Sequence, residues 1–288
     1  CPPGHGDIYA ALFGTGILDD LVDSGVRYAF ISNSDNLGAT LDFKLLNEFL
    51  NSGSSFMMEV TRRTDVDKKG GHLAKDLKNG NLLLREVAQC PQEDFNEFQN
   101  ITKHRYFNTN NIWIRLDRLR SLMRSSDNNL NLPLIINRKN LNPSDSQSSK
   151  VIQIEVAMGA AIQCFEDSTV IEVPRSRFSP VKSCEDLLAL RSDAYQVSDD
   201  FQIQLCESRG GVPPEVELSD EIFKNYKTFE EMTPYGAPSL IKCKSIQVEG
   251  PVKFGKEISF QGTITITNDS KSVKEISSGN YIDNNILL

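Results

Sequence analysis

The spacing of apolar residues predicts alternating helices and strands at the start of the chain. Leucines and valines recur at helical spacing across residues 9–26. Residues 28–32 form a short run rich in aromatic and β-branched side chains, which is typical of a buried strand. A loop at residues 36–38 precedes a second helical pattern, whose apolar positions are Leu41, Phe43, Leu45, Leu46 and Leu50. Helix, strand, loop and helix in this order indicate an α/β fold.

The middle of the chain continues this alternation with shorter elements. Further strands are predicted at residues 56–60, 82–87, 112–114 and 169–173, the last of which ends at Pro174. Polar turns are predicted at residues 65–71 and 107–111, and helices at residues 93–103 and 152–165. Residues 124–150 are rich in Ser, Asn, Asp and Pro, so we expect a mobile surface loop around an apolar island at residues 132–136.

The pattern changes near residue 190 and again near residue 240. Beyond residue 240, apolar pairs recur about every six residues and are separated by Gly250, Gly255 and Gly262. A six-residue period with glycine at the corners is typical of a β-helix. Two or three coils are too few to stand alone, so they must pack on another part of the protein. We therefore predict two domains, at residues 1–186 and 187–288.

Composition and charge narrow the classes of protein to which the chain can belong. The net charge of -8 is unsuited to a nucleic-acid partner, whose affinity depends on phosphate neutralisation, although a small phosphate ligand needs only a local site. No apolar run approaches the roughly 18 residues of a membrane span, and no signal peptide is visible. The six cysteines form no CxxC pair, which argues against a zinc site and favours reduced thiols in the cytoplasm.

A first candidate site is the Pro-Gly-His-Gly-Asp motif at residues 3–7. Glycines on both sides of His5 allow the backbone to approach a flat ligand closely. A glycine-rich loop with a structural histidine explains the motif equally well.

A second candidate is Ser-Asn-Ser-Asp-Asn-Leu-Gly at residues 32–38. Ligands of open α/β sheets bind outside the carboxyl ends of strands, where Asp35 is expected. A carboxylate there can hold Mg²⁺ together with substrate phosphates, and Asn33 can hydrogen-bond a ribose or a phosphate. The alternative is an Asx turn or a helix cap.

A third candidate combines Lys-Lys-Gly-Gly-His at residues 68–72 with Glu86 on the returning strand. Backbone at Gly70 and a carboxylate suit sugar hydroxyls, which need donors and acceptors together. The alternative is a hairpin turn with solvated lysines. Asn108 and Asn110 likewise either bind hydroxyls or make turns.

A fourth candidate is the segment at residues 173–182, in which two prolines rigidify a chain that carries Arg175, Arg177 and Lys182. A fixed cation suits the charge that develops on a transferring phosphoryl group. The alternative for Lys182 is a solvated surface residue.

Taken together, the motifs resemble one family of enzymes. PPGHGD, SNSDNLGAT, FMMEVTRRTDVDKKGGH, LLLREVAQCP, FNTNNIWIRL and VPRSRFSPVK occur in the order found in UTP–glucose-1-phosphate uridylyltransferases, also called UDP-glucose pyrophosphorylases. The resemblance covers nearly the whole chain. The segment RSDAY at residues 191–195 is similar to the monomeric enzymes of kinetoplastid protists.

The resemblance implies a Rossmann-like nucleotidyltransferase fold with a mixed sheet at residues 1–186 and a C-terminal left-handed β-helix. It implies the reversible, Mg²⁺-dependent reaction of UTP with glucose 1-phosphate to give UDP-glucose and pyrophosphate. It also implies a monomer, although the β-helix is an assembly surface in some relatives. A pyrophosphorylase for other UDP-sugars and a catalytically dead UDP-sugar-binding protein remain as alternatives.

The resemblance also assigns roles to residues. Gly4 and His5 would lie at the uridine, and Asn33 and Asp35 would face the ribose and phosphates, with Asp35 on the metal. Lys182 would contact the phosphates as the catalytic cation. The glucose contacts implied are Gly70, Glu86, Asn108 and Asn110.

One feature of the family has no counterpart here. The family carries a glycine-rich loop that ends in a lysine, upstream of its GHGD segment, and only three residues precede GHGD in this chain. Because the chain also begins at Cys1, without an initiator methionine, we expect an N-terminally truncated fragment that turns over poorly.

Overall fold

The computed structural model divides the chain into two compact units. Unit 1 comprises Cys1–Ser34 and Ala39–Phe178, and unit 2 comprises Asp35–Gly38 and Ser179–Leu288. The structure describes all residues except 1–2, 65–66, 69, 143–144, 146 and 200. Cys1 and part of the predicted turn at residues 65–71 therefore lie outside the described residues. The division falls at Phe178, whereas the sequence suggested residue 186.

Unit 1 contains five α-helices, a series of short 3-10 helices and eight strands within its described residues. The α-helices are α1 Ile8–Gly14, α2 Ile17–Asp23, α3 Phe43–Ser52, α4 Phe95–Phe98 and α5 Leu116–Ser125. The strands are β1 Tyr28–Ile31, β2 Phe56–Arg62, β3 His72–Lys75, β4 Leu82–Arg85, β5 Tyr106–Arg115, β6 Leu134–Asn140, β7 Lys150–Val156 and β8 Thr169–Glu172. The 3-10 helices are η1 His5–Asp7, η3 Val87–Gln89, η4 Gln92–Asp94, η5 Met158–Cys164 and η6 Arg175–Arg177.

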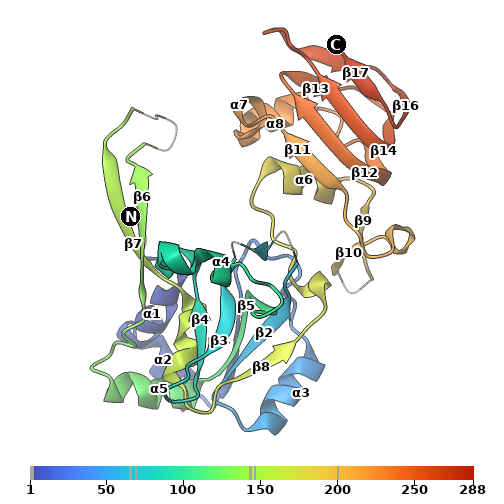
Figure 1. Cartoon of the computed structure of the whole chain (residues 1–288). Helices are drawn as coiled ribbons and strands as arrows, with labels where there is room; N and C mark the ends of the chain where they lie inside the picture. The colour runs from blue at the N-terminus through green and yellow to red at the C-terminus, as the bar shows by residue number, and fades with distance from the viewer. Residues whose placement is uncertain (1–2, 65–66, 69, 143–144, 146, 200) are drawn as a thin grey trace. The chain divides into compact units, whose positions relative to one another are not determined.

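Six of these strands form the predicted mixed sheet, in the order β4-β3-β5-β2-β8 with β1 also paired to β5 (Figure 1). Side chains alternate between the two faces along β2. Phe56 and Met58 join the core formed with α1, α2 and α5, while Met57 and Trp113 pack against Phe49 of α3. Helices thus cover both faces, as the α/β interpretation requires.

The first predicted helix is wrong in extent. The chain forms α1 and α2 instead of one helix because Gly16 adopts a left-handed φ of 83° between them. The second helix begins at Phe43, since the Asp42 side chain accepts hydrogen bonds from Lys44 N (2.7 Å) and Leu45 N (3.3 Å) as its cap. Leu41 therefore lies outside the helix and is exposed.

The surface loop predicted at residues 124–150 and the helix predicted at residues 152–165 are both wrong. Strands β6 and β7 instead form an antiparallel hairpin that pairs Leu134 with Val156 and Ile136 with Ile154 (Figure 1). The sequence Ile-Gln-Ile-Glu-Val from residue 152 alternates with period two, which favours a strand over a helix. The helical part is shorter, and is the 3-10 helix η5.

Two further elements differ from the prediction. The helix predicted at residues 93–103 ends at Phe98, and Asn100 accepts hydrogen bonds from the amides of Thr102 and Lys103 (both 3.1 Å), which forms a turn instead. The turn predicted at residues 107–111 lies inside the continuous strand β5. Asn110 has a φ of 59°, and the pairing with β2 shifts register at this point, so the polar run is a β-bulge.

Unit 2 begins with α6 Cys184–Arg191 and continues through short elements into a stack of parallel strands. The remaining helices are η7 Glu207–Arg209, α7 Asp220–Phe223 and α8 Tyr226–Met232. The strands are β9 Tyr195–Val197, β10 Ile203–Leu205, β11 Glu215–Leu218, β12 Ser239–Glu249, β13 Val252–Phe254, β14 Ile258–Thr267, β15 Lys274–Ile276, β16 Gly279–Ile282 and β17 Asn285–Leu287.

Every pairing among β11 to β17 is parallel (Figure 1). Ile246 of β12 pairs with Ile264 of β14, and both are 1% exposed, so apolar side chains stack along the interior. Parallel strands that stack in this way are expected of β-helix coils. The handedness of the coils remains a prediction.

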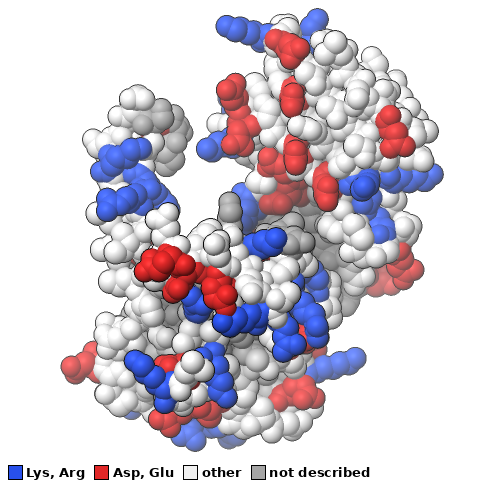
Figure 2. Space-filling view, viewed as in Figure 1, with Lys and Arg blue, Asp and Glu red and all other residues white. Residues whose placement is uncertain are grey.

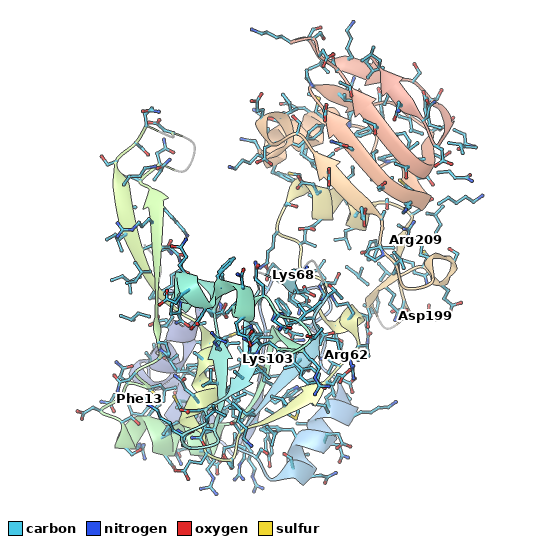
Figure 3. All side chains as sticks on the ribbon, in the orientation of Figure 1. Phe13, Arg62, Lys68, Lys103, Asp199 and Arg209 are labelled. Carbon is cyan, nitrogen blue, oxygen red and sulfur yellow. The ribbon has the colours of Figure 1, made fainter. Side chains whose placement is uncertain are left out.

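Two side chains hold the first residues of β12 in place. Arg209 Nη1 donates to the carbonyls of Leu240 (2.8 Å), Ile241 (3.0 Å) and Cys243 (2.7 Å) (Figure 3). Asp193, from the RSDAY segment, accepts hydrogen bonds from the amides of Leu240 (2.8 Å) and Ile241 (3.0 Å). The segment thus contributes to the fold of unit 2.

In the described part of the chain, no helix combines the length and apolar character needed to cross a membrane. On the face of unit 1 shown in Figure 2, acidic and basic side chains are interspersed, and Lys and Arg also gather on the β6–β7 hairpin.

Candidate functional site

The Gly-His-Gly-Asp motif packs against the end of β7. Gly4 has φ 87° and ψ 166°, a conformation open essentially only to glycine, and an added Cβ would lie 2.6 Å from the Val156 carbonyl oxygen. The Val156 amide donates to the Pro3 carbonyl (2.9 Å). His5 Nδ1 accepts a hydrogen bond from the Met158 amide (2.9 Å), so this nitrogen is unprotonated. The motif and the start of η5 therefore form one structure.

The bulge in β5 presents two asparagines that bond to each other. Asn108 Nδ2 donates to Asn110 Oδ1, and the Asn110 amide donates to Asn108 Oδ1, both at 2.8 Å. The Asn108 amide donates to the Gly71 carbonyl (3.3 Å). A Cβ added to Gly159 of η5 would lie 2.7 Å from Asn108 Nδ2. The bulge therefore lies against both η5 and the glycine pair at residues 70–71.

Glu86 follows β4 and faces the same glycine pair. A Cβ added to Gly71 would lie 2.5 Å from Glu86 Oε1, and one added to Gly70 would overlap the ring of Phe107. Burial raises the pKa of Glu86 to about 7. A carboxyl group with this pKa is present in both protonation states near neutral pH, so it can donate or accept a hydrogen bond.

A chain of contacts thus joins residues that are distant in sequence. It runs from His5 to Met158, from Gly159 to Asn108, from Asn108 to Gly71 and from Gly71 to Glu86. The predicted residues brought together in this part of unit 1 are Gly4, His5, Gly70, Glu86, Asn108 and Asn110. The pattern of motifs did not single out Gly159. Asn33 is half-buried in the loop that follows β1.

Arg63 holds the segment that precedes the glycine pair. Its guanidinium donates to the carbonyls of Phe98, His104 and Asp67 (each 3.2 Å) and of Lys68 (2.8 Å). Beneath it, the buried ring of His72 stacks on His104 at 4.1 Å between centroids. Burial, with the nearby His104 as the next cause, lowers the pKa of His72 to about 3, so this ring stays neutral.

The other predicted residues lie in unit 2, in a structure that we call the clasp, made of residues 35–38 and 179–182. Asn36 pairs antiparallel with Pro180, the Leu37 amide donates to the Ser179 carbonyl (3.1 Å), and the Val181 amide donates to the Asp35 carbonyl (2.9 Å). Buried Asn36 Oδ1 also accepts from the amides of Gly38 (3.1 Å) and Ser179 (2.8 Å).

The clasp brings the two charged groups of the second and fourth motifs together. Lys182 Nζ lies 4.0 Å from Asp35 Oδ2, and the two side chains are 65% and 34% exposed. The Lys182 amide donates to Asp186 Oδ2 (2.8 Å), which also completes the capping box of α6 with Ser183. An exposed ion pair of this length contributes little to stability, so each group can leave the other and bind a ligand instead.

The described residues contain no group of three or more His, Cys, Asp and Glu side chains that could hold a metal. Mg²⁺ does not need such a group, because it is bound by one or two carboxylates together with substrate phosphates and water. The single carboxylate of Asp35, beside a cation that can contact the same phosphates, fits that kind of site.

The two arginines of the fourth motif have other partners. Arg175 donates to both oxygens of Asp67 (2.8 and 2.9 Å), and these bonds help hold the pKa of that carboxyl below its usual value despite burial. Arg177 forms a buried, bidentate pair with Glu59 of β2. The sequence analysis did not identify Glu59, although a lone acid in the apolar run Phe-Met-Met-Glu-Val signals a buried charge that needs a partner.

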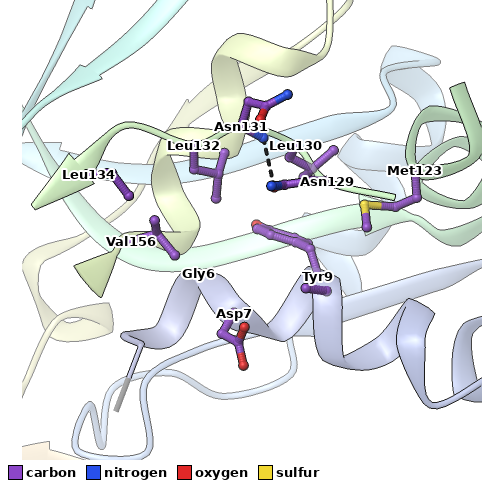
Figure 4. Close-up of a pocket in the computed structure, with 11 residues that line it drawn as sticks. Gly6, Asp7, Tyr9, Met123, Asn129, Leu130, Asn131, Leu132, Leu134 and Val156 are labelled. Carbon is purple, nitrogen blue, oxygen red and sulfur yellow. Dashed lines mark hydrogen bonds between the residues drawn. The ribbon is translucent and has the colours of Figure 1, made fainter. Parts of the chain in front are cut away.

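A pocket of about 310 Å³ is lined in part by the first motif (Figure 4). Gly6, Asp7 and Tyr9 line it, together with Asn129 and Asn131, whereas Gly4 and His5 do not. Tyr9 donates to the Met158 carbonyl (2.8 Å), and burial raises the pKa of this phenol. The pocket therefore does not contain the predicted site residues.

Comparisons with known proteins give a consistent result. The family model described as UTP–glucose-1-phosphate uridylyltransferase matches residues 1–261. The uridylyltransferase of Musa acuminata is 39% identical over 286 residues, which cover 99% of this chain and 59% of that protein. The uridylyltransferase of Saccharomyces cerevisiae is 39% identical over 283 residues, with 98% and 55% coverage.

Solved structures are similar as well. A Trypanosoma brucei protein described as UDP-glucose phosphorylase has a TM-score of 0.89 at 51% identity and covers all of this chain and 62% of that one. A mutant UDP-glucose pyrophosphorylase of Leishmania major in complex with UDP-glucose has a TM-score of 0.88 at 48% identity, with 100% and 63% coverage. The chain thus spans less than two thirds of the length of these relatives.

The packing of Gly4 gives a first prediction. Because Gly4→Ala meets both a glycine-only conformation and the Val156 carbonyl, we expect it to lower the free energy of unfolding by more than about 2 kcal/mol. Gly16→Ala is the control, since Gly16 has a positive φ but open space around it, and should cost about 1 kcal/mol. Urea unfolding measures both. Equal losses would show that the contact with β7 contributes nothing.

The raised pKa of Glu86 gives a second prediction. The folded-state pKa of about 7 exceeds the ordinary glutamate pKa of 4.5, so the stabilising contribution is complete below about pH 4.5 and is lost as pH rises through about 7. Glu86→Gln cannot ionise, so relative to this variant the wild type should lose stability between about pH 5 and about pH 8.

Urea midpoints of both proteins across this range test the point. The lowered pKa values of His72 and His104 give the opposite slope below about pH 6.5, but they are common to both proteins and cancel in the difference. A difference that does not change with pH would contradict the assignment to Glu86.

Proposed function

Since the chain belongs to the UTP–glucose-1-phosphate uridylyltransferase family, we propose that it supplies sugar-binding and phosphate-binding residues for that reaction. The reaction transfers uridylyl from UTP to glucose 1-phosphate and gives UDP-glucose and pyrophosphate, reversibly. The chain covers 59% of its Musa relative, so the activity of the whole protein is part of the proposal.

The observation that carries the proposal is the distance of 4.0 Å between Asp35 and Lys182. Backbone hydrogen bonds of the clasp hold the two segments together, so both charges are available to one diphosphate. Nucleotidyl transfer depends on positioning and electrostatics more than on covalent chemistry. A general base is unnecessary, because the phosphate of glucose 1-phosphate is already an anionic nucleophile.

The groups of the clasp have complementary roles in this proposal. The Lys182 ammonium contacts phosphate oxygens and stabilises the negative charge that develops during transfer. Asp35 holds Mg²⁺, which when bound neutralises charge on the phosphates. Asn33, two residues before Asp35, faces the ribose and phosphates.

The cluster in unit 1 is suited by itself to a sugar and a base. Glu86, Asn108, Asn110 and the backbone at Gly70 contact the glucose, whose hydroxyls need both donors and acceptors. The raised pKa of Glu86 supports this role because the carboxyl group can supply either. Gly4 and His5 lie at the uridine. The Leishmania relative was solved with UDP-glucose, which supports this choice of ligand.

We further propose that these 288 residues alone turn over poorly, because they contain no glycine-rich loop upstream of GHGD to supply the second phosphate-binding element. A cytoplasmic location, a monomeric state and a left-handed coil of the β-helix complete the proposal. The absence of CxxC pairs supports the cytoplasmic location, because it favours reduced thiols.

The proposal is tested by calorimetric binding of UDP-glucose with Mg²⁺ and with EDTA, together with a turnover assay for UTP formation from UDP-glucose and pyrophosphate. Asp35→Ala should abolish the Mg²⁺-dependent part of the affinity. Lys182→Ala should weaken binding by about tenfold or more and, wherever turnover is measurable, reduce it by about 10²–10³. Lys271→Ala, at an exposed lysine of unit 2, is the control.

Two results would count against the proposal. Unchanged binding by both clasp variants would remove the roles of Asp35 and Lys182. Robust turnover by the 288-residue chain would contradict the requirement for a further phosphate loop. Equal turnover of UDP-galactose or UDP-N-acetylglucosamine would instead indicate a pyrophosphorylase of broader specificity.

A further inference from the structure

Glu59 is a carboxylate enclosed entirely by hydrogen-bond donors. Its side chain is 0% exposed and lies in the middle of β2. Oε2 accepts from Arg177 Nε (2.7 Å) and Asn111 Nδ2 (3.0 Å), and Oε1 accepts from Arg177 Nη2 (2.8 Å) and Trp113 Nε1 (2.9 Å). The charge is therefore fully paired, and no ligand can reach it.

The same network holds two segments of chain that are far apart in sequence. Arg177 Nη2 also donates to the Thr40 carbonyl (3.0 Å), and Asn111 Nδ2 donates to the Arg177 carbonyl (3.2 Å). Thr40 comes five residues after Asp35, and Arg177 comes five residues before Lys182. The two segments that lead into the clasp are thus attached to one carboxylate of the sheet.

Stability alone gives little reason for such a pair. The desolvation of two buried charges offsets most of their attraction, and apolar residues of similar volume often serve as well. The pair instead fixes the orientation of its two side chains, because the planar guanidinium and the carboxylate bond in one bidentate geometry. The hydrogen bonds of Arg177, Asn111 and Trp113 given above are likewise directed at Glu59 or at the two segments.

We propose that the Glu59–Arg177 pair positions the diphosphate site by fixing the two segments that carry Asp35 and Lys182. The inference rests on the proposed function of those two residues. Glu59 and Arg177 are positioning residues in this account, since neither contacts the ligand.

A matched control pair exists on the same strand. Arg62 of β2 donates to Glu172 of β8 at 2.8 Å, and both side chains are largely exposed (Figure 3). This ion pair also joins two strands of the sheet, but it contacts neither segment that leads into the clasp. Arg62→Met therefore removes an ion pair without changing the proposed positioning.

Hydrogen exchange measured by NMR or mass spectrometry tests the inference without any ligand. Glu59→Gln keeps the volume but only one acceptor oxygen, so only one of Trp113 and Asn111 keeps its acceptor. The double variant Glu59→Gln/Arg177→Met leaves no unpaired charge, so it replaces the single variant in this experiment if the single variant does not fold. The amides of Leu37, Ser179 and Val181 should exchange at least about tenfold faster in these variants, while those in the centre of β5 change little.

Binding provides the readout that separates positioning from general destabilisation. With UDP-glucose as probe, Glu59→Gln should lose most of the Mg²⁺-dependent affinity, as Asp35→Ala does, and its affinity in EDTA should fall no further than that of Lys182→Ala. A merely structural role would lower the affinity in EDTA beyond the loss measured for Lys182→Ala. Arg177→Lys keeps the charge but not the planar fork of the guanidinium. Its Mg²⁺-dependent affinity should therefore lie between those of wild type and Glu59→Gln.

The outcomes are separable. Wild-type exchange of the clasp amides in the folded variants, or exchange that accelerates equally across β2 and β5, overturns the positioning role. An Asp35→Ala variant that binds like wild type defeats the proposed function, while the exchange experiment still decides whether the ion pair holds the clasp. Arg62→Met should match wild type in both measurements.

Discussion

The buried ion pair between Glu59 and Arg177 is the constraint on which the rest of the site depends. A charge in the centre of a sheet is tolerated only when every lone pair is satisfied. Satisfying Glu59 requires Asn111 and Trp113 on β5 and the guanidinium of η6 to lie at fixed places. Arg177 also donates to the Thr40 carbonyl. The segments at Thr40 and Arg177, which lead into the clasp, must therefore keep their places for Glu59 to remain paired.

The cluster in unit 1 and the clasp in unit 2 are suited to different chemical tasks. Recognition of sugar hydroxyls needs paired donors and acceptors at close range, and the bulge of β5 presents both in the hydrogen bonds between Asn108 and Asn110. Binding of phosphates needs opposite charges that remain accessible. The clasp supplies these charges with Asp35 and Lys182. Because both side chains are accessible, each can leave the other and bind a ligand instead.

Much of the fold could be predicted where one local pattern dominated. The apolar runs at β1, β2, β4 and β8 gave correct strands, and the six-residue period correctly indicated stacked parallel strands in unit 2. The β6–β7 hairpin was missed because its short alternating run lies beside turn-forming residues. The polar run in β5 was read as a turn because a bulge depends on the partner strand, which local composition does not reveal.

The site shows the same limit. Motifs identified Asp35 and Lys182 separately, and the resemblance placed both at the phosphates. The fold adds the antiparallel pairing of Asn36 with Pro180, which brings them together. Glu59 and Gly159 were missed because their importance lies in long-range partners, Arg177 and Asn108. In both cases the sequence contained a signal, a lone acid or a glycine in an apolar run, but the partner could not be read from neighbouring residues.

The most direct test of the central claim is a crystal structure of the chain with Mg²⁺ and UDP-glucose. The account predicts that Lys182 Nζ lies within hydrogen-bond distance of a phosphate oxygen, with the metal on Asp35 and the Glu59–Arg177 pair intact. A diphosphate bound elsewhere, with Asp35 and Lys182 still facing only each other, would contradict it.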